Sequence, residues 1–138
     1  MSQYQWHCEV RDYEIDMQGI VHHAVYINYL EQCRNTYVKK LGIDIFKYHQ
    51  LGYDLVIAGI DVRYKSSLRP HDTFYVTATM HMQGRFKIIF DQEIRRPNHA
   101  LVLTAKVICV CVENSTGNPC MPAILEAVMA NISTNCAH

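Results

Sequence analysis

Residues 16–41 read DMQGIVHHAVYINYLEQCRNTYVKKL and contain the longest periodic pattern of the chain. From His23 to Leu41, apolar and aromatic side chains recur at three- and four-residue intervals, the period of a helix with one buried face. These positions are Tyr26, Leu30, Cys33, Tyr37 and Leu41. Lys39 and Lys40 complement the helix dipole in the last turn, and Gly42 is a natural stop. We therefore predict an amphipathic helix of about five turns.

Outside this helix the chain alternates between apolar and polar residues, as β-strands do. We predict strands over Tyr4–Arg11, Tyr53–Tyr64, Thr73–Gln83, Lys87–Arg95 and Leu101–Glu113. Ala58-Gly59 indicates a bulge or a close approach, and helical segments are expected over 44–49 and 123–132. The order of strand, long helix and four strands in meander predicts an α+β domain, with an antiparallel sheet folded around one helix. No linker interrupts it, so we expect a single domain over 1–138.

Charge and composition exclude several classes of protein. Thirteen basic and thirteen acidic residues cancel, which leaves no global field for nucleic acid or an anionic membrane surface. No apolar run approaches the length of about 20 residues that a membrane span needs, and residues 1–11 lack the core of a signal peptide. We expect a cytoplasmic protein with six reduced cysteines, in which Cys109 and Cys111 are small core residues.

A carboxylate stands beside the predicted helix start. Asp16 and Gly19 belong to a turn that runs directly into the helix near His23. The first backbone N–H groups of a helix lack partners and carry partial positive charge, so they can stabilise an oxyanion. An electrophilic carbonyl bound there would meet Asp16. The simpler interpretation is that Asp16 only caps the turn or the helix.

The same residues resemble the signature of hotdog-fold acyl-CoA thioesterases of the hydroxybenzoyl-CoA thioesterase-like family. That signature is Asp, two residues, Gly, Ile or Val, Val, four residues, Tyr, and its places are filled by Asp16, Gly19, Ile20, Val21 and Tyr26. The similarity covers most of the chain, from about Tyr4 to Pro122. It includes Val10, Arg11, Glu14, Tyr29, Glu31, Arg34, Leu68, Arg69, Pro70, Asp72 and Gly84. The resemblance implies a curved antiparallel five-stranded sheet wrapped around one long central helix.

The resemblance also implies a reaction, the hydrolysis of an acyl-CoA, or of an acyl chain on a carrier protein, to free acid and thiol without a cofactor. In that family the matching aspartate attacks the thioester or activates a water, and both routes stay open for Asp16. The backbone N–H of His23 becomes the oxyanion donor, and two roles stay open for its imidazole, to orient the aspartate or to hydrogen-bond the substrate. Gly19 supplies a conformation or a close approach, and Val21 is assigned to substrate binding.

Three neighbouring positions leave alternatives. The hydroxyl of Tyr26, which we include among the catalytic residues, reaches the pocket or satisfies a core hydrogen bond. His22 and His23 diverge by about 100° on a helix and lack further ligands, so we expect no metal site. Glu31 and Arg34, at i and i+3, favour an ion pair on the helix surface or at an interface, which makes Glu31 structural.

Coenzyme A carries phosphates, so its site needs cations. We predict Lys65, Arg69, Arg85 and Lys87 in this role, against the alternative of a solvated strand edge. An open sheet edge and the resemblance together predict a homodimer with sites at its interface, or a tetramer of two dimers. A non-catalytic acyl-CoA-binding module is the rival function, because binding needs only the pocket. The signature of hotdog hydratases is missing.

Overall fold

The computed structural model describes residues 3–136, and the side chains from Gln3 to Ile132. Strand β1 (Tyr4–Glu9) is followed by a short 3-10 helix η1 (Asp12–Glu14), the long helix α1 (Val25–Lys40) and α2 (Ile45–Gln50). Strands β2 (Tyr53–Tyr64), β3 (Thr73–Gln83), β4 (Lys87–Arg95) and β5 (Leu101–Glu113) precede a last helix, α3 (Ala123–Cys136). This succession confirms the predicted α+β class.

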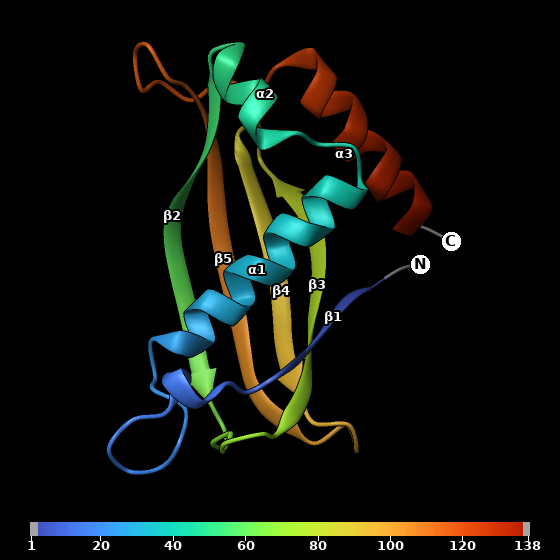
Figure 1. The fold of residues 1–138 in the computed structure, drawn as a ribbon. Coiled ribbons are helices and arrows are strands. Elements are labelled where there is room, and N and C mark those ends of the chain that lie inside the picture. Colours follow the sequence, from blue (N-terminus) through green and yellow to red (C-terminus); the bar gives the residue numbers. More distant parts are fainter. Residues whose placement is uncertain (1–2, 137–138) are drawn as a thin grey trace.

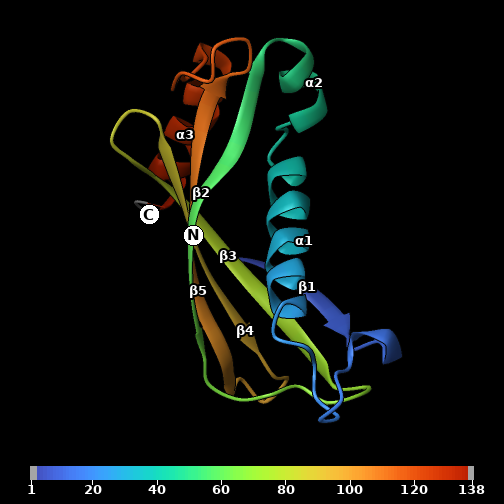
Figure 2. The ribbon, with the colours of Figure 1, turned by 90° about the vertical axis from the view of Figure 1, so that its left-hand side faces the viewer.

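The five strands form one antiparallel sheet in the order β1-β3-β4-β5-β2. The sheet is curved, and α1 crosses one of its faces diagonally (Figures 1 and 2). Seven residues of helix α1 are buried, among them Tyr26, Tyr29, Leu30 and Cys33. A curled antiparallel sheet around a central helix is the hotdog arrangement, so the fold expected from the sequence is confirmed.

Helix α1 is shorter than its sequence pattern predicts. It holds 16 residues, about four and a half turns at 3.6 residues per turn. The prediction placed its start at His23, but His23 and Ala24 form a turn and the helix begins at Val25. The end agrees, because Leu41 follows as the C-cap and Gly42 adopts the left-handed backbone with φ +85°.

The interior contains one feature that the spacing of charges does not predict. The side chain of Arg34 points into the core, where its Nη1 donates to Oε1 of Gln92 on β4 at 3.2 Å. Arg34 is only 6% exposed, and no ion pair joins it to Glu31 within 4 Å. The predicted surface pair is therefore wrong. A partner 58 residues away along the chain outcompetes the neighbour at i−3.

Helix α3 covers the part of the sheet that β1 leaves unpaired. Strand β1 pairs only with residues 73–78 of β3. Beside the remaining end of β3, α3 buries Leu125, Met129 and Ile132 at helical spacing, and it lies near the start of β1 in space (Figure 1). The predicted helix over 123–132 is thus confirmed and extends to Cys136.

The remaining sequence predictions concern details of the sheet. The register of β2 against β5 shifts between Ile57 and Gly59, so the Ala58-Gly59 step is a β-bulge. The described cysteines are free thiols, and Cys109 and Cys111 are both buried in the core, while the thiol of Cys136 lies outside the described side chains. None of the helices in the described part of the chain is long and apolar enough to cross a membrane.

Candidate active site

The loop that carries Asp16 is closed by its own backbone. The N–H of Asp16 donates to the carbonyl of Ile20 at 2.8 Å, and the N–H of Gly19 donates to the carbonyl of Asp16 at 3.1 Å. An isolated bridge between Ile15 and Val21 closes the base of the loop. Gly19 has φ +81°, and an added Cβ would meet no atom within 4 Å. The left-handed backbone is therefore one of the two predicted reasons for glycine here, and no protein atom makes the other necessary.

The carboxylate of Asp16 has one oxygen engaged by this loop. Its Oδ1 accepts from the N–H of Gln18 at 2.8 Å and from that of Ile20 at 3.4 Å. No backbone N–H of the described residues donates to Oδ2, and the exposed side-chain amide of Gln18, turned with its nitrogen inward, lies 3.0 Å from it. The backbone of the loop thus engages Oδ1, and the contact of Oδ2 within the loop is the exposed side chain of Gln18.

Asp16 opens into a cavity of about 330 Å³ at the start of α1. Three parts of the chain meet there, namely the loop, the first turn of α1 and the end of β2 (Figure 1). The lining residues are Asp16, Ile20, Val21, His23, Tyr26, Tyr64, Lys65, Ser66 and Ser67. The cavity brings together five residues assigned to the site from sequence: Asp16, Val21, His23, Tyr26 and Lys65. Sequence reasoning did not find Tyr64, Ser66 and Ser67, because no local pattern links them to Asp16.

The turn before α1 leaves one N–H unused. The N–H of Val25 donates to the carbonyl of His22 at 2.9 Å, and the N–H of Ala24 donates to Nδ1 of His22 at 3.2 Å. No acceptor within the described residues is bonded to the N–H of His23. The residue His23 lines the cavity together with Asp16. The imidazoles of His22 and His23 stack with centroids 4.3 Å apart. Among the described side chains, no group of three His, Cys, Asp or Glu could hold a metal ion.

Glu14 is hydrogen-bonded to the residue that precedes this turn, and it was not assigned a role from the sequence. Its carbonyl accepts from the N–H of His22 at 3.0 Å. Its buried carboxylate accepts from the hydroxyl of Tyr29 at 2.7 Å and from the backbone N–H and Nη1 of Arg11 at 2.8 and 3.2 Å. Burial first, and then the bond to Glu14, raises the pKa of Tyr29 well above its usual range. Glu14 therefore joins the end of β1, α1 and the helix-start turn.

Tyr26 contributes its ring more than its hydroxyl. The hydroxyl accepts from the N–H of Leu68 at 2.9 Å, the core hydrogen bond that was one of its two predicted uses. The ring lines the cavity and meets the ring of Tyr64 edge-on at 5.6 Å. Burial is the main cause that raises the pKa of Tyr26. Tyr26 forms a wall of the cavity and ties it to the segment after β2.

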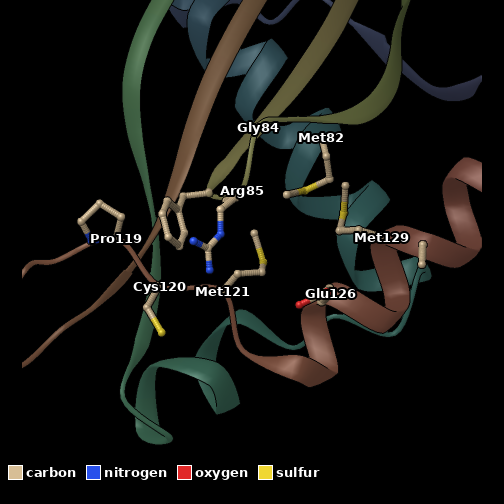
Figure 3. A pocket seen from close by; sticks show the side chains of 10 residues that line it. Met82, Gly84, Arg85, Pro119, Cys120, Met121, Glu126 and Met129 are labelled. Carbon is tan, nitrogen blue, oxygen red and sulfur yellow. The ribbon is translucent and has the colours of Figure 1, made fainter.

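The four predicted cations do not converge within one chain. Lys65 lines the cavity, and Arg69 is exposed in the turn that follows β2. Tyr64, which lines the cavity, pairs with Leu103 of β5, whereas Lys87 pairs with Val110. Lys87 is therefore seven residues along β5 from the cavity, which is about 24 Å at the rise of a strand. Arg85 lines a second cavity of about 600 Å³, together with Glu126 and three methionines (Figure 3).

Comparison with known proteins identifies relatives of this chain. Residues 10–132 match the family model of the thioesterase-like superfamily. The chain is 36% identical over 107 residues to the acyl-acyl carrier protein thioesterase ATL3, chloroplastic, of Arabidopsis thaliana. The aligned region covers 77% of this chain and 56% of that protein. It is 29% identical over 111 residues to the putative acyl-CoA thioesterase YneP of Bacillus subtilis, 80% of each.

Among solved structures, the fold is similar to that of SAV2348 from Staphylococcus aureus in complex with CoA, with a TM-score of 0.89. The sequence identity is 18%, over 97% of this chain and 85% of that one. The chain spans little more than half the length of ATL3, so that relative is a longer protein. The family match, by contrast, takes in nearly every element of the sheet, α1 and the Asp16 loop. The chain belongs to the thioesterase-like superfamily.

Proposed function

We propose that this protein hydrolyses acyl thioesters of coenzyme A or of a carrier protein, and that Asp16 is its catalytic carboxylate. The observation that carries this proposal is a single cavity lined by Asp16 and by His23, whose backbone N–H is unused. A carboxylate and an oxyanion donor at one site are the minimum that acyl transfer to water requires. The relatives named above as thioesterases support the same reaction class.

The reaction needs two groups in defined roles. Oδ2 of Asp16 attacks the thioester carbonyl carbon, or takes a proton from a water that attacks it, and the carbonyl π electrons move onto the oxygen. The His23 N–H at the positive end of α1 stabilises that oxyanion. When the carbonyl re-forms, the C–S bond breaks and the thiolate leaves, to be protonated by solvent. The nucleophilic route adds a mixed anhydride that a water molecule then hydrolyses.

The rest of a CoA substrate has to be held by cations. Lys65 lines the cavity and Arg69 lies in the turn after β2, so we assign them to hydrogen bonds with the amide carbonyls of the uncharged pantetheine arm, the part of CoA nearest to the thioester. Arg85 and Lys87 lie near the opposite end of the sheet, and we assign them to the nucleotide end of a bound CoA, in the same subunit or a neighbouring one. Val21 and Tyr26 line the space beside the thioester.

We infer that the active unit is a homodimer joined through β2. Strand β2 is an edge of the sheet, and its large apolar side chains are exposed: Val56 by 42%, Ile57 by 47% and Ile60 by 40%. A long apolar edge strand presents unpaired backbone groups that an identical edge can satisfy across a two-fold axis. Sedimentation equilibrium tests the inference, because a mass near 16.0 kDa at full specific activity would refute it.

The direct test of the function is a hydrolysis screen over a panel of acyl-CoAs and acyl carrier proteins, with free thiol as the signal. Thiol release by the wild type, lost in Asp16→Asn, supports the proposal. Tight binding of acyl-CoA without thiol release by the wild type would establish the rival, a non-catalytic binding module, because binding needs only the pocket.

A further inference from the structure

Tyr64, the last residue of β2, touches the start of α1 across 41 residues of sequence. Its hydroxyl donates to the carbonyl of His23 at 2.9 Å. Its ring packs edge-on against Tyr26 and lines the Asp16 cavity, although 47% of the residue is exposed. The side chain of Tyr64 is half exposed, but its hydrogen bond fixes the orientation of its hydroxyl toward the carbonyl of His23.

Two consecutive peptide planes are held around His23. The plane between His23 and Ala24 is fixed on both sides, by Tyr64 at its carbonyl and by Nδ1 of His22 at its N–H. The plane before it is held by the carbonyl of His22, which accepts from Val25. Because each peptide unit is rigid, the bond to the His22 carbonyl sets the direction of the N–H of His23. The bonds of Tyr64 and of the His22 ring hold the next unit, which joins the first at the Cα of His23. The carbonyl of His22, which accepts from Val25, also polarises the N–H of His23, because the two groups belong to one peptide unit.

The helix itself supplies little of this control. The N-cap of α1 is Ala24, in the helical region at φ −76° and ψ −22°, and no side chain caps it. Most helix starts are secured by a Ser, Thr, Asp or Asn at this place, and alanine cannot do so. The position of the first turn therefore depends on contacts from outside the helix, and Tyr64 is the one that also lines the cavity.

We propose that Tyr64 is a positioning residue, whose hydroxyl holds the carbonyl of His23 and thereby steadies the turn that directs the His23 N–H at the thioester oxygen as charge develops. The inference rests on the proposed thioesterase function and adds a residue to it. An oxyanion donor acts only when it is already oriented in the ground state. Loss of the Tyr64 hydroxyl should therefore reduce the stabilisation of the transition state while leaving the affinity for the bound substrate almost unchanged.

The kinetic test compares Tyr64→Phe, which keeps the ring against Tyr26, with Tyr64→Ala, which removes it. Tyr53→Phe is the matched control, since Tyr53 is at the opposite end of the same strand. For Tyr64→Phe we expect kcat to fall about tenfold with KM unchanged, because only orientation is lost. Tyr64→Ala should lose at least as much, and the control should match the wild type. A rise in KM alone would overturn the proposal in favour of a substrate contact, and unchanged kcat would overturn it outright.

A second measurement separates this inference from the thioesterase proposal. Amide hydrogen exchange, followed by NMR in the absence of any substrate, reports the hold on the helix-start turn directly. In Tyr64→Phe the amides of Ala24 and Val25, which donate to Nδ1 and to the carbonyl of His22, should exchange about fivefold faster, as expected for a turn that has lost one hydrogen bond. Equal exchange in the wild type and the variant would refute the positioning role even in an active enzyme. A wild type that releases no thiol would refute the thioesterase proposal, while exchange still decides whether Tyr64 holds the turn.

Discussion

The cavity at Asp16 and the cavity at Arg85 differ in size and in kind. The one at Asp16 measures about 330 Å³, and a network of backbone hydrogen bonds surrounds it. The one between the β3–β4 turn and α3 measures about 600 Å³ and is lined by Met82, Met121 and Met129 (Figure 3). Flexible methionines fill space adaptably and impose little geometry. The smaller cavity is the better candidate, because chemistry depends on oriented polar groups and not on volume.

The charged groups of the two cavities make the same point. At the larger cavity, Arg85 lies over the ring of Phe86 at 5.3 Å and Glu126 is exposed, and the two form no ion pair within 4 Å. At the smaller one, Asp16 has one oxygen bound to two N–H groups of its own loop. Only the second carboxylate is held in one orientation, as a catalytic group has to be.

The largest expected effect contrasts these two carboxylates. Asp16→Asn should reduce kcat about 10³-fold, since the amide can neither attack nor take a proton. Glu126→Gln, the matched change at the other cavity, should leave kcat within about twofold. Thiol release from an acyl-CoA measures both, with circular dichroism to check folding. Near-normal turnover in Asp16→Asn would remove the basis for preferring the smaller cavity.

The support beneath the Asp16 end should show as stability. Glu14→Ala leaves the Tyr29 hydroxyl and Arg11 without their buried partner, at a cost of about 2 kcal/mol. Glu126→Ala removes an exposed carboxylate and should change the free energy of unfolding by less than about 0.5 kcal/mol. Urea denaturation of both variants checks the difference. Equal midpoints would mean that the network around Glu14 contributes nothing to the free energy of unfolding.

The smallest effect concerns substrate affinity and uses two substrates. Lys65→Ala and Arg85→Ala should each raise KM for an acyl-CoA about fivefold with little change in kcat, as loss of uniform binding does. With an acyl thioester of N-acetylcysteamine, which lacks the nucleotide, the Arg85 effect should vanish. The two KM values together locate the nucleotide. An unchanged KM of Arg85→Ala for acyl-CoA would remove the larger cavity from the CoA path.

Much of this fold is predictable because its elements are encoded by short-range periodicity. The helical repeat from Tyr26 to Tyr37 and the alternation in the strands predict α1 and all five strands, with boundaries that agree within two residues. The start of α1 is the exception. Its prediction at His23 differs because Tyr64 and His22 hold this turn out of the helix through hydrogen bonds that no periodicity reports.

The candidate site divides in the same way. Asp16, Gly19, Val21 and Tyr26 lie within eleven residues, so one local motif contains them, and the left-handed backbone of Gly19 is a local property. The packing of distant segments is not local. Pairing of β2 with β5 carries Tyr64 to His23, and β4 brings Gln92 to Arg34 in the core. Charge spacing along the chain cannot report distance across a sheet, so only the strand register places Lys65 beside Asp16 and Lys87 far from it.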